Sequence, residues 1–310
     1  MQVFSTIIPI FAVVILGFIA RRMGFMPPAF LEPANRMVYY LAIPALIFKA
    51  VAKASFVTEF NITVLLVTLA SALTAYLGAW IIGHFTRWPP GRIGTFIQCS
   101  AHGNLGYIGI PVAFYFLGPS GLAKASILAG FLMIMQNTLS VLALQTHSLG
   151  EAGTGKKIRE VAEKLVHNPI IISAATGILI SLFQIPLPGV LQRFLDILSG
   201  LAPPMSLLLI GAALSLQVMR KNIGSVMGAV AIKILLLPTI GLVCFIALGI
   251  PAKEYLPGLI LLATPTATIA YVMAKEMHGD DAFAVAAIST STIVSAGTYM
   301  IWLTVVGNGG

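Results

Sequence analysis

Charged residues are scarce in this chain of 310 residues. Asp, Glu, Lys and Arg together make up 9% of it, hydrophobic residues make up 58%, and the mean hydropathy is +0.97. An ordinary soluble domain carries about 25% charged residues. The shortage excludes a soluble globular protein and indicates an all-α protein that crosses a membrane several times.

Cysteine is nearly absent as well. The two cysteines, Cys99 and Cys244, both lie inside apolar runs. Cysteines placed in this way argue against a disulfide framework and against a cysteine-based metal site. We therefore expect no metal and no cofactor.

Ten apolar runs, separated by charged or Pro- and Gly-rich junctions, predict ten transmembrane helices. The first run has no basic stretch before it and is followed by Arg21 and Arg22, so we expect a retained helix and not a cleaved signal peptide. The runs lie near residues 3–21, 37–53, 62–83, 93–117, 121–146, 168–184, 199–218, 223–249, 255–277 and 281–306.

Lysine and arginine are unevenly divided between the two sides of the predicted spans. Twelve fall on one side and five on the other, with Lys233 left inside a span. Because cytoplasmic loops carry the excess of basic residues, we expect both termini outside the cytoplasm. The net charge of +8 then reflects the loops of a multi-pass protein in the plasma (inner) membrane, and the expected partner is the lipid bilayer, not nucleic acid.

The chain reads as two related halves. The polar segment 147–167 leaves five spans on each side, and an odd number of spans places the second half in the membrane upside down. We therefore expect one transporter domain, 1–310, made of repeat one (1–146), a cytoplasmic linker (147–167) and repeat two (168–310). An offset of 160 residues aligns Pro9 with Pro169, Gly17 with Gly177, Pro28 with Pro188 and Pro44 with Pro204.

The fourth span of each half contains residues that break a helix. The breaks lie at 99–111 and 263–274, and we expect broken helices 4 and 9 to cross near the membrane midplane. Gly103 permits unusual backbone angles, Asn104 can cap the next half-helix, and Pro265 removes a donor. Free N–H groups at the start of each second half-helix favour an anion such as a carboxylate.

Three segments resemble the auxin efflux carrier family. They are NLGYIGIP at 104–111, the run Pro265, Thr266, Ala267 followed by Ala274, Lys275 and Glu276, and NRMVYYLAIPALIF at 35–48. The resemblance covers nearly the whole chain. This chain departs from the plant members in having Gly103 where they place a proline, and it lacks their long central loop, so it looks like a compact prokaryotic-type member.

The resemblance implies two inverted repeats of five spans, related to the fold of bile-acid sodium symporters. It also implies a scaffold, often dimeric, in 1–54 and 168–220, and a transport domain in 55–146 and 221–310 that slides like an elevator. Plant members export auxin, an indole carboxylate, and many bacterial members are assigned to dicarboxylates. The implied function is a secondary transporter of small organic anions that works as a homodimer.

The candidate site residues follow from the breaks and from polar groups inside spans. Lys233 could balance substrate charge, bond exposed carbonyls or snorkel, and His102 could titrate or simply be a buried, hydrogen-bonded histidine. Pro111, Pro44 and Pro204 are expected to be architectural. The candidates for substrate contact are Gly103, Asn104, Leu105, Pro265, Thr266, Ala267, Thr268, Gln136 and Asn137. The alternatives are that the threonines bond their own helix and that the amides join helices.

Other mechanisms remain as alternatives. All ten acidic residues fall in loops or near the ends of spans, which argues against a cation antiporter with an intramembrane aspartate. A sodium-coupled anion symporter could still use carbonyls and hydroxyls, and coupling to protons or sodium stays open. An intramembrane enzyme would need His102 as a base beside a hydroxyl such as Ser100, but no acid accompanies this pair.

Overall fold

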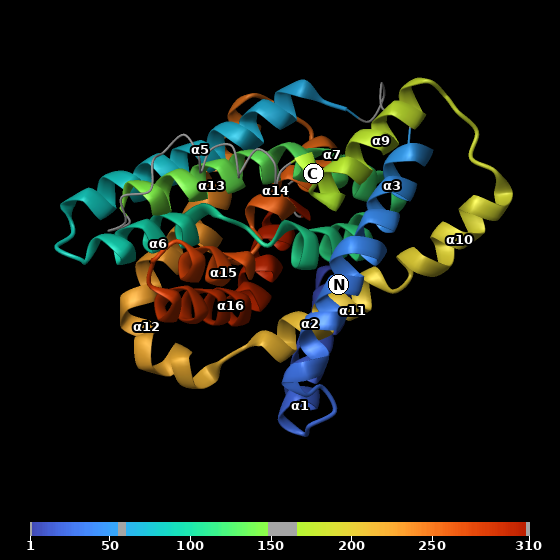
Figure 1. Ribbon diagram of the computed structural model, residues 1–310. Helices are drawn as coiled ribbons and strands as arrows, with labels where there is room; N and C mark the ends of the chain where they lie inside the picture. The colour runs from blue at the N-terminus through green and yellow to red at the C-terminus, as the bar shows by residue number, and fades with distance from the viewer. Residues whose placement is uncertain (1, 55–59, 148–165, 308–310) are drawn as a thin grey trace.

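The computed structural model describes residues 2–54, 60–147 and 166–307, and Figure 1 shows that they form a bundle of helices. The only β-structure in these residues is one isolated antiparallel bridge between Gly103 and Thr266. The expected all-α class is therefore confirmed. The linker expected at 147–167 lies outside the described residues except at 147, 166 and 167.

The first half of the chain begins with α1, and several of its helices are interrupted by wide turns. The π-helical turns η1 and η2 each lead directly into an α-helix. The helices are α1 (Gln2–Arg22), α2 (Pro28–Met37), η1 (Val38–Ala42), α3 (Ile43–Lys53), α5 (Ile62–Phe85), α6 (Pro90–Ala101), η2 (Leu105–Gly109) and α7 (Ile110–Thr146).

Helix α7 consists of two segments joined at Gly118. This residue has φ 70° and ψ −164°, a backbone geometry that glycine adopts without steric cost, and Pro119 follows it. The sequence analysis separated two runs at the same place, between residues 117 and 121. The kink therefore marks the boundary that the sequence predicted.

The second half repeats the pattern of short and interrupted helices. A third π-helical turn, η3, lies in the middle of a long helical stretch. The helices are α9 (Pro169–Leu182), α10 (Gly189–Ser199), α11 (Ala202–Ala213), α12 (Leu216–Ala231), η3 (Ile232–Leu236), α13 (Leu237–Ala247), α14 (Ala252–Leu262), α15 (Ile269–Glu276) and α16 (Asp281–Gly307).

Six helical stretches of the described residues are long and apolar enough to cross a membrane. The other helices of the described residues do not meet both conditions. Helix α9, for example, is apolar but has only 14 residues. The six stretches are Val3–Arg22, Ile62–Phe85, Leu105–Thr146, Gly189–Ala213, Leu216–Ala247 and Asp281–Val306.

Two helices begin earlier than the sequence analysis placed them. Residues 28–36 and 189–198 were left outside the predicted spans, but they form most of α2 and α10. Both helices carry charged residues, such as Arg36 and Asp196, and both are strongly amphipathic. Average hydropathy misses helices of this kind, because their polar face offsets their apolar face.

Close helix packing depends on glycine at two crossings. An added Cβ on Gly17 would overlap the carbonyl of Leu208, and one on Gly211 would overlap the carbonyl of Val14, so α1 and α11 touch backbone to backbone. In the other crossing, an added Cβ on Gly177 of α9 would lie 3.0 Å from Val51 Cβ of α3. Small residues allow this close approach of helices in membranes.

We expect Gly211→Val to destabilise the protein. The added side chain has no room beside Val14, so α1 and α11 must separate, and overpacking of this kind costs about 1–3 kcal/mol or more. The measurement is thermal unfolding of the purified protein in detergent. Gly224→Val is the control, since an added Cβ at Gly224 meets nothing within 4 Å; equal melting temperatures for the two variants would contradict the packing argument.

The helices gather in two groups around the centre of the molecule. In Figure 1, the labels of α5, α6, α12, α13, α15 and α16 lie on one side and those of α1, α2, α3, α10 and α11 on the other. Contacts agree with this grouping, since α1 packs on α11, α12 packs on α16 and α5 packs on α6 and α13.

Candidate functional site

The two predicted breaks are bonded to each other. The amide of Asn104 donates to Pro265 O at 2.8 Å, and the amide of Ala267 donates to His102 O at 2.9 Å. These bonds form the antiparallel bridge of Gly103 with Thr266. We call residues 102–105 and 263–268 together the junction; segments more than 150 residues apart in the sequence meet there, running in opposite directions.

Side chains from two other helices complete the bridge. The amide of Gly103 donates to Gln136 Oε1 of α7 at 3.2 Å, and the amide of Thr266 donates to Ser291 Oγ of α16 at 3.0 Å. Gln136 also donates through Nε2 to Ala101 O at 3.1 Å. Buried backbone groups need partners, and here each half of the chain supplies one for its own break.

The side chain of Asn104 uses its hydrogen-bond acceptor but not its donor within the described residues. Its Oδ1 accepts from the amide of Tyr107 at 3.3 Å and so caps the helix that follows, as the sequence predicted. Its Nδ2 has no hydrogen-bond partner in the described residues, although the side chain is only 4% exposed. An unpaired buried donor costs about 1–3 kcal/mol, so this group is suited to a ligand oxygen.

Lys233 places a basic group at the same junction. It lies in the π-helical turn η3, is fully buried, and donates through Nζ to Leu262 O at 2.8 Å. A Cβ added to Gly103 would lie 3.3 Å from Nζ. Of the three expectations for this lysine, the structure shows the bond to a carbonyl, and its complete burial excludes snorkelling to the membrane surface.

His102 belongs to a buried chain of hydroxyl groups. Its Nδ1 lies 2.9 Å from Ser140 Oγ, and Ser140 Oγ lies 2.8 Å from the hydroxyl of Tyr76, which donates to Gln136 O. His102 is thus buried and hydrogen-bonded. Ser100 instead donates to Phe96 O in its own helix, so the pair proposed for an enzyme does not form.

The remaining predicted residues differ in whether they form a hydrogen bond at the junction. Thr266 does not bond its own helix; its Oγ1 donates to Cys99 O of the other break at 3.0 Å. Asn137 does bond its own helix, by donating to Met133 O at 2.8 Å, and makes no hydrogen bond to the junction within the described residues. Leu105, Pro265 and Ala267 are buried, Thr268 is half-buried, and Pro44, Pro111 and Pro204 lie in the first turns of α3, α7 and α11.

Sequence reasoning missed Ser291, Ser140 and Tyr76. A signal for Ser291 was present, because residues 289–292 form an unbroken Ser/Thr run (STST) in a predicted span, and all four residues are buried. Ser140 lies near Gln136, Asn137 and Thr138, and Tyr76 lies near Thr74, but no pattern in these residues links the two to His102. A single hydroxyl in a membrane helix most often bonds its own backbone, so neither one pointed to His102.

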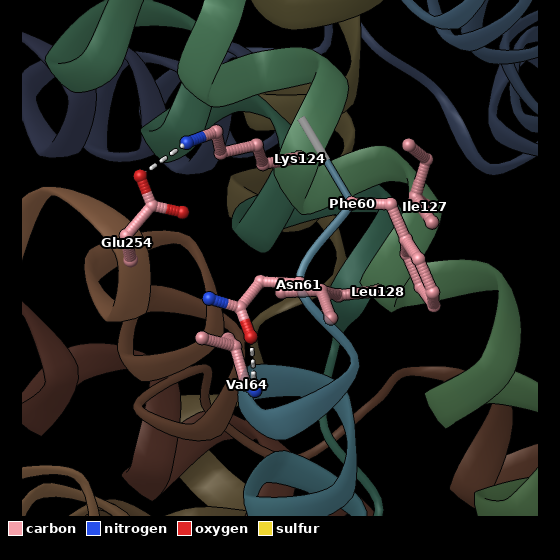
Figure 2. Close-up of a pocket in the computed structure, with 7 residues that line it drawn as sticks. All are labelled: Phe60, Asn61, Val64, Lys124, Ile127, Leu128 and Glu254. Carbon is pink, nitrogen blue, oxygen red and sulfur yellow. Dashed lines mark hydrogen bonds and ion pairs between the residues drawn. The ribbon is translucent and has the colours of Figure 1, made fainter. Parts of the chain in front are cut away.

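A separate hollow lies between α5, α7 and α14. Figure 2 shows Lys124 pointing toward Glu254, and their ion pair measures 2.9 Å. Arg92 and Asp280 form a comparable pair at 3.2 Å, between the start of α6 and the start of α16. Each pair joins the first helix of one broken span to the start of the span that follows the other broken span.

Comparison with known proteins gives consistent results along the chain. The family model for "Membrane transport protein" matches residues 2–303. A "Putative malonate transporter" from Rhizobium meliloti is 24% identical over 301 residues, covering 96% of this chain and 93% of that protein. An "Uncharacterized transporter" from Methanothermobacter thermautotrophicus is 22% identical over 300 residues, covering 96% of each chain.

Proposed function

The chain belongs to the membrane transport protein family, in agreement with the family resemblance of its motifs, and from this premise we propose that it carries small organic anions bound at the junction. It is thus a multi-pass membrane transporter and not an enzyme. The observation that carries the proposal is the buried Nδ2 of Asn104, which has no hydrogen-bond partner among the described residues and lies in a junction without carboxylates. Such a site donates hydrogen bonds and repels no anion.

The proposal includes ten spans in two inverted repeats of five. The 160-residue offset relates α2 and α3 to α10 and α11, and it relates the crossing at Gly177 to the crossing at Gly17. The ion pairs Lys124–Glu254 and Arg92–Asp280 also correspond, with their charges exchanged. The antiparallel direction of the bridge is what two inverted repeats would produce, with broken helices 4 and 9 crossing there.

Transport then requires the junction to face each side of the membrane in turn. We propose that residues 55–146 and 221–310 slide as a transport domain against a scaffold of 1–54 and 168–220, which also forms a homodimer. The two groups of helices in Figure 1 support this division. Tyr107, next to the junction, donates to Asn35 O at 3.3 Å, so this bond crosses the proposed sliding surface and must break in each cycle.

The proposed cargo is a small carboxylate. Dicarboxylates are favoured over auxin-like acids, because a relative bears the name malonate transporter and this chain resembles compact prokaryotic members. The proposed location is the plasma (inner) membrane, with both termini outside the cytoplasm.

The test is exchange in proteoliposomes that contain the purified protein. Radiolabelled malonate, succinate, pyruvate and indole-3-acetate would be offered in turn, with sodium and pH gradients varied separately. We expect carboxylates to be exchanged, and we expect malonate, but not its neutral analogue malonamide, to compete. Equal competition by malonamide, or no exchange of any carboxylate, would overturn an anion site.

A further inference from the structure

Lys233 is a buried basic side chain for which the described residues provide no acidic partner. The ion pairs among the described residues involve other basic side chains, for example Lys49 with Asp196 and Lys124 with Glu254. Resting on the proposed function, we propose that Lys233 is a counter-ion built into the anion site, which moves with the bound anion and cancels one of its negative charges.

The position of the ammonium group supports this role. Leu262, whose carbonyl accepts from Nζ at 2.8 Å, is the last residue of α14, directly before the break. The C-terminal end of a helix carries a partial negative charge that favours a cation. On the other side, Gly103 is so near that an added Cβ would lie 3.2 Å from Cε of the lysine, and the next residue is Asn104.

The sequence holds Lys233 in place through the wide turn η3. Pro238 has no N–H and cannot bond Ile234 O, four residues earlier, so this carbonyl is free within the helix. Trp302 of α16 supplies the missing donor, since its Nε1 donates to Ile234 O at 3.0 Å. The turn around Lys233 is thus fixed to α16, the helix that also supplies Ser291 to the junction.

A cation in such a place is stable only with compensation. An unpaired charge inside a membrane protein is costly, and one carbonyl removes only part of the cost. A bound carboxylate would complete the pair. Its oxygens could accept from Asn104 Nδ2, which also has no partner within the described residues.

The charge carried by each form of the transporter follows directly. With Lys233 charged, the site has a charge of +1 when empty, zero with a monocarboxylate and −1 with a dicarboxylate. Exchange uses only the loaded form. The membrane potential should therefore have no effect on monocarboxylate exchange but should alter dicarboxylate exchange.

The size of the effect can be estimated from the potential. Moving one elementary charge through a 100 mV difference changes an equilibrium by about 50-fold. For saturating substrate on both sides, we expect an exchange rate to change by about threefold between zero and 100 mV. A site with no net charge should show no change.

The experiment measures exchange of radiolabelled pyruvate and radiolabelled malonate by the wild-type protein under potassium diffusion potentials. We expect pyruvate exchange to be independent of potential and malonate exchange to change about threefold. Pyruvate exchange that depends on potential would overturn the counter-ion role, whereas no exchange of either anion would overturn the proposed function itself.

Variants separate the charge from the packing of the side chain. Lys233→Met should make pyruvate exchange sensitive to potential, while Lys233→Arg should leave it insensitive. The control is Lys221→Met, an exposed lysine on the preceding helix α12, which should behave as wild type. If Lys233→Met gives no exchange, the two wild-type measurements decide, and unchanged insensitivity in an active Lys233→Met protein would overturn the proposal.

Discussion

Replacing Asn104 with aspartate is expected to lower carboxylate exchange by about 100-fold or more. The substitution keeps an oxygen that can accept from the amide of Tyr107, so the helix cap survives. It removes the free Nδ2 donor, whose hydrogen bond to a charged ligand would contribute about 1.5–3 kcal/mol. It also places a negative charge where the anion would bind. The measurement is malonate exchange in proteoliposomes at equal amounts of inserted protein.

Asn61 provides a matched control for this substitution. Its side chain caps α5 by accepting from the amides of Thr63 and Val64, and it lines the hollow of Figure 2, to which no junction residue contributes. Asn61→Asp makes the same chemical change at an equivalent helix start. We expect exchange within about twofold of wild type, because Asp and Asn cap helices about equally well. A wild-type rate of exchange by Asn104→Asp would show that binding of the anion does not depend on the Asn104 side chain.

Replacing Gln136 with leucine is expected to have the second large effect, on stability as well as on transport. Gln136 accepts from the amide of Gly103 and donates to Ala101 O, and its side chain is 1% exposed. Leucine leaves both backbone groups buried and unpaired, at about 1–3 kcal/mol each. We therefore expect a loss of about 3 kcal/mol in unfolding free energy and a loss of exchange. Thermal unfolding in detergent measures the first and proteoliposome exchange the second.

The neighbouring amide is the control for Gln136. Asn137 donates only to Met133 O of its own helix in the described contacts, so Asn137→Leu should leave the junction intact. Its melting temperature and its exchange should remain near wild type. Equal destabilisation by the two leucine variants would show that Gln136 is not what holds the first break.

The breaks could be predicted from the sequence because their signals are local. Asn104 and Pro265 each act on the backbone of their own segment, through capping and a missing donor. The expectation for Gly103 was wrong in its reason: its φ is not positive, and the missing side chain instead leaves room for Thr264 and Lys233. The 160-residue offset then related the two segments to each other. The structure shows the two segments joined by backbone hydrogen bonds from Asn104 and Ala267, a direct pairing that the sequence analysis did not predict.

The partners of the breaks could not be predicted, because they depend on how helices are rotated about their axes. Gln136 and Asn137 are adjacent amides, yet only Gln136 reaches the junction, since successive residues of a helix point about 100° apart. Lys233 stood out as a charge within a span. Its contacts with Leu262 and Gly103 depend on the wide turn η3. That turn depends in turn on Pro238, five residues after Lys233, and on the hydrogen bond from Trp302 of α16.

The amphipathic starts of α2 and α10 were missed for a different reason. Asp196 pairs with Lys49 of α3 at 2.6 Å, so a residue that lowers local hydropathy is part of a contact between helices. An average of hydropathy counts Asp196 only as a polar residue, so it misses a helix that a charged residue helps to hold in place. The order of residues along the chain predicted where helices lie, but it did not predict which side chains of distant helices pair with each other.

A structure of the protein with bound malonate would test the central claim most directly. The account predicts the anion at the junction, between residues 102–105 and 263–268, with a carboxylate oxygen within hydrogen-bond distance of Asn104 Nδ2, about 3 Å. Malonate bound elsewhere, for example in the hollow beside Lys124, with Asn104 Nδ2 still unpaired, would contradict it.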